Sequence, residues 1–247
     1  RPPAATLTPL TTEIIHRADS GRSYQGIPMH AAGGVHEYAL KLVRTRVAPG
    51  STVLDVGTGS GALSARLHDA GFAVTACDIS GAGYAAEPPL VIWDATGESL
   101  PRGIAEGTLD CVCAIEVIEH MENPLQALRN FRSLLKPGGL LVVSTPNVSH
   151  PRSRLKFLLR GEPSYFGPTE YFSSGHRTIL PDWMLQLHAR EAGFEELRVT
   201  YAGLLGLSGA GKLAYTAMAP LFAVLGMQPK PRTDDGCVTF ITARRPA

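Results

Sequence analysis

The sequence predicts a single α/β domain in which helices cover both faces of a doubly wound, mostly parallel β-sheet. Short apolar runs that are typical of buried strands alternate along the chain with segments of helical periodicity. The clearest unit is the apolar run 53–56, which enters a turn containing Gly57, Gly59 and Gly61 and then a helical pattern over 62–67. A strand, a tight glycine turn and a helix in this order open many doubly wound sheets.

Composition and charge agree with one domain that buries a full core. The chain has 247 residues, of which 44% are hydrophobic and 18% are charged. The net charge of +1 gives no electrostatic reason to expect nucleic acid as a partner.

The cysteines indicate a reducing compartment. Three of the four lie in apolar, strand-like runs, so we expect buried thiols and a cytoplasmic protein. Cys111 and Cys113 do not have the spacing of a zinc pair, and no second pair could complete a site, so no metal ligands are predicted. No signal peptide is visible, and because residue 1 is Arg we expect the natural start to be missing.

Residues 1–32 are expected to form an N-terminal arm, because prolines and threonines precede any clear periodicity. A helix should begin near Gly34, where apolar residues start to recur every three to four positions. Pro49 and Gly50 then end this helix and turn the chain into the first strand.

Residues 33–147 form the predicted core of the domain. After the glycine turn, further strands are expected at 73–77, 90–93, 109–115 and 140–145. Glycines and prolines between residues 79 and 89 predict that the helix there is short or distorted. A helix that starts at Pro124 connects the last two of these strands.

Residues 148–194 are expected to face the substrate. A basic run of Arg152, Arg154, Lys156 and Arg160 forms either a solvated helix face or an attraction for an anionic or sugar-bearing substrate. A helix through 183–192 follows, and strands at 195–201 and 237–243 complete the sheet.

Between these two strands lies an almost wholly apolar insert, 203–228. It predicts buried helices at the edge of the domain, a lid over an apolar acceptor, a homodimer surface, or a helix in peripheral contact with a membrane. Lys212 and Pro220 interrupt the run, which argues against a membrane span.

Four acids follow or end predicted strands: Asp55, Asp78, Asp94 and Glu116. Because the carboxyl ends of parallel strands meet at one edge of a sheet, we expect one site there. The glycine turn also fits a dinucleotide-binding pattern, but a carboxylate at Asp55 would repel a pyrophosphate. A cationic ligand would instead be stabilised.

Residues 55–61 (DVGTGSG) therefore resemble the first motif of the class I methyltransferases, which depend on S-adenosyl-L-methionine (SAM). The stretch Glu116, Glu119 and His120, ahead of Pro124, resembles the ubiquinone-type small-molecule O-methyltransferases. The resemblance covers about residues 50–147. It implies a seven-stranded sheet with an antiparallel last strand, SAM as the cofactor, S-adenosylhomocysteine as the product, and methyl transfer to a small-molecule or glycan acceptor, most readily at a hydroxyl oxygen.

The resemblance also implies roles for individual residues. Asp78 with Ile79 would meet the ribose, Asp94 with Ala95 the adenine, and Ile115 with Glu116 the methionine part of SAM. The remaining cofactor-binding candidates are the turn residues Gly57, Thr58, Gly59 and Gly61, His36 for the SAM carboxylate, and Tyr24 for closure over the cofactor. An exposed helix histidine is an equal reading of His36.

Transfer to a hydroxyl requires a proton acceptor near neutral pH, and a histidine suits this role. His176 is the first candidate, and His120 and His150 are second choices, although His176 and His120 could each instead hold a loop together. Divalent metals assist some relatives, but no ligand set is evident in the sequence. Methylation at nitrogen or carbon, and a non-catalytic SAM-binding subunit, remain alternatives.

Overall fold

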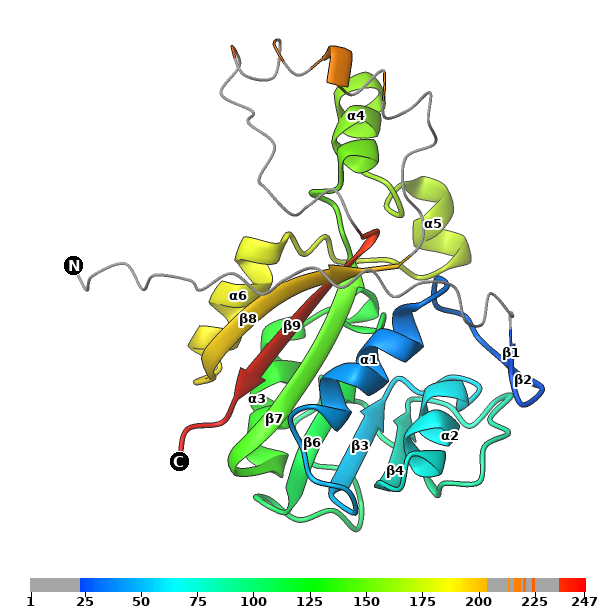
Figure 1. The fold of residues 1–247 in the computed structure, drawn as a ribbon, viewed down its shortest axis with the longest axis vertical. Helices are drawn as coiled ribbons and strands as arrows, with labels where there is room; N and C mark the ends of the chain where they lie inside the picture. The colour runs from blue at the N-terminus through cyan, green and yellow to red at the C-terminus, as the bar shows by residue number, and fades with distance from the viewer. Residues whose placement is uncertain (1–22, 204–212, 214–215, 219, 221–223, 225–235) are drawn as a thin grey trace.

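The computed structural model describes residues 23–203, 213, 216–218, 220, 224 and 236–247 (Figure 1). Its centre is a seven-stranded sheet with the strand order β5-β4-β3-β6-β7-β9-β8. The strands are β3 (Thr52–Val56), β4 (Ala73–Asp78), β5 (Leu90–Ile92), β6 (Leu109–Ala114), β7 (Leu135–Pro146), β8 (Glu195–Ala202) and β9 (Val238–Arg244). All pairs are parallel except β7 with β9 and β8 with β9, so the predicted fold class is confirmed.

Helices cover both faces of this sheet (Figure 1). On one face α1 (Val35–Arg44) and α2 (Ala62–Asp69) pack on β3, β4 and β7. On the other face lie α3 (Pro124–Leu134) and α6 (Asp182–Glu191), which also contact each other. Each face therefore has its own apolar core, one built around Val35, Leu67 and Val53 and the other around Leu54, Phe131 and Leu185.

Local sequence explains where these helices begin. Pro124 occupies the first turn of α3, and the Asn123 side chain accepts a hydrogen bond from the backbone N–H of Gln126 at 3.1 Å. Pro151 begins α4 (Pro151–Arg160) in the same way, with the His150 ring accepting from the N–H of Arg152. Within residues 23–203, the remaining helical segments are α5 (Pro168–Ser173) and the short 3-10 helix η1 (Ile118–His120).

Of the arm predicted over residues 1–32, the structure describes residues 23–32, which contact the domain. β1 (Ser23–Tyr24) and β2 (Ile27–Pro28) pair antiparallel as a hairpin beside α2. Gln25 and Tyr24 both donate hydrogen bonds to the Asp69 carboxylate, and the Ser60 hydroxyl donates to the carbonyl of Pro28. The hairpin is thus tied to both ends of α2.

Two further segments differ from expectation. Residues 79–89 contain no helix, because glycines and the pair Pro88 and Pro89 keep the chain in turns. β7 starts at Leu135, five residues before the predicted strand, and the predicted turn lies inside it as an irregularity. Gly138 has a φ of +73°, and the pairing with β6 jumps from Leu109 with Leu135 to Cys111 with Leu140. Most of the apolar insert 203–228 lies outside the described residues.

Within the described residues, none of the helices combines the length and apolar character that crossing a membrane requires.

Candidate functional site

The four predicted acids stand at the ends of four neighbouring strands. The order β5-β4-β3-β6 places these strands side by side, and Val56 of β3 is in register with Cys77 of β4 and with Ala114 of β6. Asp78 is likewise in register with Ile92, the last residue of β5. The chain order reverses between β3 and β6, which is where ligands bind in doubly wound sheets.

The glycine turn is fixed to the end of β4. The N–H groups of Gly57 and Thr58 both donate to the carbonyl of Cys77, at 2.8 and 3.1 Å. The N–H of Gly59 donates to Oδ2 of Asp78 at 2.9 Å, while Oδ1 of Asp78 accepts from the N–H of Ser80. Asp78, the residue predicted to bind the ribose, therefore joins the glycine turn to the end of β4.

Any residue other than glycine at position 57 would require the Val117 side chain or the backbone of the turn to move. The φ of Gly57 is +70°, and an added Cβ would lie 2.2 Å from Cγ2 of Val117. At Gly59 a Cβ would meet only the ring of His30, at 3.8 Å. The turn thus approaches the loop after β6 on one side and stays open toward His30 on the other.

Asp55 faces the protein interior. Only 2% of its surface is exposed, and its carboxylate accepts a 2.6 Å hydrogen bond from the Ser64 hydroxyl, which also contacts the Thr58 hydroxyl at 2.7 Å. Burial raises the pKa of Asp55 to about 6. Asp55 can act on a ligand at the turn only through the Ser64 and Thr58 hydroxyls or through its charge.

Other residues predicted to contact SAM divide into exposed and buried groups. Ile79 is 74% exposed, and the Asp94 side chain is exposed with its Oδ1 accepting from the N–H and hydroxyl of Thr96. Ala95 belongs to the core, and its carbonyl accepts from Asn130. Ile115 is also buried, against the α1 and α2 side of the sheet.

Glu116 and Glu119 are neighbouring carboxyl groups on the loop after β6. Glu116 has a φ of +53°, its N–H donates to the Ser144 hydroxyl, and that hydroxyl donates to its Oε1, both at 2.9 Å. Burial raises the pKa of Glu116 to about 7, and burial and the charge of Glu116 raise the pKa of Glu119 further above its ordinary value.

The two catalytic candidates, His120 and His176, lie together although they are far apart in sequence. Their rings are edge to face with centroids 4.8 Å apart. Nδ1 of His120 is 3.2 Å from the carbonyl of Gly175, and Nδ1 of His176 is 2.6 Å from the carbonyl of Tyr165. The backbone N–H groups of Arg177 and Thr178 donate to the carbonyl of Glu119, which fixes the His176 loop on η1.

Glu119, His120 and His176 could also hold a metal ion. One donor atom from each lies within 4.8 Å of the other two, and a carboxylate with two imidazoles is a donor set used by several divalent cations. The sequence did not predict this group, because His176 is distant in the chain and no local spacing signals it.

A cavity of about 250 Å³ adjoins His176. Its walls are Phe166, Gly167, Pro168, Tyr171, His176, Arg177 and Ile179. An empty cavity of about 150 Å³ can hold benzene, so this one has room for a substituted ring. Phe166 also touches the His176 ring, with centroids 5.5 Å apart. Among the described residues, this cavity is the most suitable place for an acceptor.

Tyr24 contacts Asp69, and His36 lies near Arg66 and His30, so their predicted roles at SAM stay predictions. The Tyr24 hydroxyl is 2.6 Å from Asp69, at the far end of α2 from the glycine turn, and its ring covers the Arg66 guanidinium. Burial, followed by the charge of Arg66, lowers the pKa of His36 to about 4. His36 is therefore neutral at pH 7 and offers no positive charge to a carboxylate. His30, which faces Gly59, is better placed.

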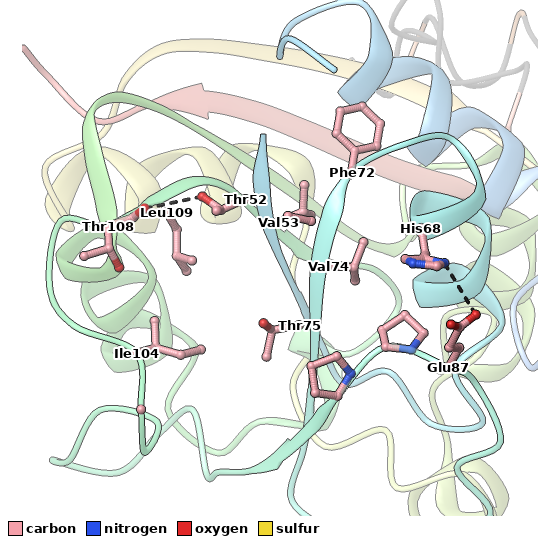
Figure 2. Close-up of a pocket in the computed structure, with 14 residues that line it drawn as sticks. Thr52, Val53, His68, Phe72, Val74, Thr75, Glu87, Ile104, Thr108 and Leu109 are labelled. Atoms are coloured by element: carbon pink, nitrogen blue, oxygen red, sulfur yellow. Dashed lines mark hydrogen bonds and ion pairs between the residues drawn. The ribbon is translucent and has the colours of Figure 1, made fainter. Parts of the chain in front are cut away.

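A larger hollow, of about 590 Å³, lies away from these groups (Figure 2). Its residues include Thr52 and Val53 of β3 and Val74 and Thr75 of β4, at the amino ends of the parallel strands. Its only ion pair joins exposed His68 and Glu87 at 3.9 Å. It is distinct from the edge where the four acids meet.

Comparison with known proteins agrees with this geometry. Residues 32–199 match the family model described as "Methyltransferase domain". The ubiquinone biosynthesis O-methyltransferase of Caulobacter vibrioides is 45% identical over 108 residues, which are 40% of this chain and 42% of that protein. The enzyme of the same name from Xanthomonas campestris pv. campestris is 39% identical over 129 residues, 49% of this chain and 52% of that protein. The chain thus matches about half the length of these relatives.

Solved structures share the fold. A SAM-dependent methyltransferase from Archaeoglobus fulgidus matches with a TM-score of 0.58 and 18% identity, over 85% of this chain and 95% of that one. Phosphoethanolamine N-methyltransferase 2 of Haemonchus contortus, in complex with SAM, matches with a TM-score of 0.60 and 16% identity, over 90% of this chain and 55% of that one. The sheet order, the glycine turn and the family match together place the chain in the methyltransferase domain family, with the class I SAM-dependent methyltransferase fold.

Proposed function

We propose that this chain is a SAM-dependent methyltransferase that methylates a hydroxyl oxygen of a small molecule. The proposal depends on one observation: the acid-lined edge of the sheet and the cavity beside His176 lie on either side of η1, where His120 contacts His176. The relatives named O-methyltransferases favour oxygen over nitrogen or carbon as the acceptor atom.

The residues at the sheet edge suit SAM. Its sulfonium and ammonium are cations, and its ribose and adenine present hydroxyl and amino donors, all of which favour carboxylate partners. Asp78 and Asp94 would hold the adenosine part, with Ile79 against it, while the turn Gly57–Gly61 and His30 would face the methionine part. When bound, SAM supplies a methyl group activated by positively charged sulfur.

The chain's own residues would then align the acceptor and receive its proton. Phe166, Tyr171 and Ile179 provide apolar walls, and alignment of this kind can supply ~7–11 kcal/mol. His176 is the first choice as proton acceptor, because it lines the cavity and its Nδ1 is already engaged by a carbonyl. Such a base contributes about 10²–10⁴-fold.

The cysteines support the proposed cytoplasmic location. Cys77, Cys111, Cys113 and Cys237 are all buried and form no disulfide, as expected of thiols in a reducing compartment.

The proposal is tested by calorimetry with SAM. It is also tested by measuring the S-adenosylhomocysteine that forms from SAM when dihydroxyphenols, sugars or amines are offered as acceptors. Wild type should bind SAM at micromolar concentration, and Asp78→Ala should bind about 10–100-fold more weakly, because charged hydrogen bonds contribute about 1.5–3 kcal/mol. Glu191→Ala, an exposed acid on α6, is the matched control and should bind as wild type does. Tight NADH binding, or SAM affinity that is unchanged in Asp78→Ala, would overturn the proposal.

A further inference from the structure

Tyr165 has an unusual backbone conformation next to the proposed acceptor cavity. Its φ is +67°, and among the described residues only Gln25, Glu116 and Glu196 share a positive φ without being glycine. The left-handed region is unfavourable for a bulky aromatic residue, so the surrounding structure must hold Tyr165 there.

Contacts on both sides of Tyr165 provide this constraint. The preceding N–H, of Ser164, donates a 2.8 Å hydrogen bond to the hydroxyl of Ser153, which is 1% exposed. The following residue, Phe166, is 3% exposed and packs on His176. The Tyr165 side chain packs against the core under α1 and α2, and its hydroxyl lies beside the Cys237 thiol.

This conformation allows the backbone of Tyr165 to make one short hydrogen bond. The carbonyl oxygen of Tyr165 lies 2.6 Å from Nδ1 of His176. A carbonyl can only accept, so Nδ1 of His176 must carry the hydrogen. In a neutral imidazole the lone pair is then on Nε2, whereas a free imidazole exchanges between both tautomers.

We propose that Tyr165 is a positioning residue that fixes the tautomer and ring orientation of His176. Its left-handed backbone directs the carbonyl at Nδ1, and Nε2 is left as the nitrogen that can accept the proton of the acceptor hydroxyl. The catalytic value of this arrangement rests on the proposed function, but the tautomer itself does not.

The same arrangement recurs at the neighbouring histidine. Nδ1 of His120 faces the carbonyl of Gly175, which also has a left-handed backbone, with a φ of +73°. The two edge-to-face rings are therefore both held through Nδ1, and His120 makes a further hydrogen bond to the backbone of Glu116. Glycine adopts this conformation without strain, whereas Tyr165 adopts it against its own preference.

The test is the nitrogen spectrum of the histidine side chains in ¹⁵N-labelled protein at pH 8, with His176 assigned from the signals that His176→Gln loses. Wild type should show a protonated Nδ1 and an unprotonated Nε2 at His176. Tyr165→Asn should keep this tautomer, because asparagine tolerates the left-handed region, and Tyr165→Phe should keep it as well.

Tyr165→Ile should change the signal, because β-branched residues strongly disfavour this conformation. We expect the Nε2-protonated form to appear and kcat for methyl transfer to fall at least tenfold, with KM for SAM unchanged. Gln25→Ile is the matched control: it creates the same conflict in the hairpin, at a φ of +49°, and should leave the His176 signals as they are.

An Nε2-protonated His176 in wild type would overturn the proposal, and so would an unchanged tautomer in a folded Tyr165→Ile. If Tyr165→Ile does not fold, an Nε2-protonated His176 in wild type or a changed tautomer in Tyr165→Asn still overturns the proposal. A wild type with the expected tautomer but without methyl transfer to any acceptor would refute the proposed function and leave this inference standing.

Discussion

Replacement of Gly57 by alanine separates backbone strain from steric overlap at the glycine turn. Gly57 has a φ of +70°, and an added Cβ would lie 2.2 Å from Cγ2 and 2.6 Å from Cβ of Val117. Gly50 provides the comparison, since its φ is +79° and nothing lies within 4 Å of its added Cβ. Both substitutions carry the conformational penalty, and only Gly57→Ala carries the overlap.

The two effects have known sizes. A left-handed conformation costs a residue with a Cβ about 1–2 kcal/mol, so Gly50→Ala should lower the free energy of unfolding by about that amount. Forcing an extra carbon into a packed site costs a further ~1–3 kcal/mol. Gly57→Ala should therefore lower the free energy of unfolding by about 2–5 kcal/mol in total.

Urea unfolding of wild type, both single variants, Val117→Gly and the double variant Gly57→Ala/Val117→Gly measures these differences. We expect a coupling of about 1–3 kcal/mol in the double variant, because removal of the Val117 side chain makes room for the new methyl group. Equal destabilisation by Gly57→Ala and Gly50→Ala, or strict additivity with Val117→Gly, would refute the claim that Val117 closes on the turn.

Three further substitutions test the buried ionisable groups. The raised pKa of Asp55 contributes stability below about pH 4 that is lost as the pH rises to about 6, so Asp55→Asn should gain about 3 kcal/mol relative to wild type between pH 4 and 7. The lowered pKa of His36 has the opposite effect on stability. The stability that it contributes is complete above pH 6.5 and is lost as the pH falls to about 4, so wild type should lose about 3 kcal/mol on acidification and His36→Gln should not. Arg66→Ala should cost about 3–5 kcal/mol, because it leaves the largely buried Glu37 carboxylate without the guanidinium 2.8 Å away. The exposed pair gives the control, with Arg129→Ala expected to cost less than about 1 kcal/mol.

Unfolding free energies measured in steps of one pH unit from 4 to 8 check the first two expectations. The opposing contributions of Asp55 and His36 should make the wild-type profile flatter than that of either variant. Parallel profiles for wild type and Asp55→Asn would contradict the assigned burial of that carboxylate. For Arg66, a loss no larger than that of Arg129→Ala would contradict a buried ion pair.

The sheet could be predicted from the sequence because its signals are local. The apolar run before Gly57 and the glycines after it specify strand and turn within a few residues, and each acid lies at the carboxyl end of its own strand or within two residues of it. The common location of Asp78, Asp94 and Glu116 then follows from parallel topology alone.

The histidine pair could not be predicted in the same way. His120 and His176 meet because the backbone of the second loop bonds to the carbonyl of Glu119, and such a contact leaves no spacing in the sequence. The contact of Tyr24 shows the same limit, because its ring covers Arg66 through the geometry of the hairpin, which no local spacing signals. Contacts between loops that are distant in sequence therefore set the limit.

β9 lies between β7 and β8 and pairs antiparallel with both, although it follows them in the chain. During synthesis β8 has no neighbour to pair with until β9 has left the ribosome, so its backbone stays available to other chains. The half of the sheet that carries the glycine turn needs no such delay, since β3, β4, β5 and β6 are made in succession. We expect β8 to be the segment that most needs protection by chaperones while this protein is being made.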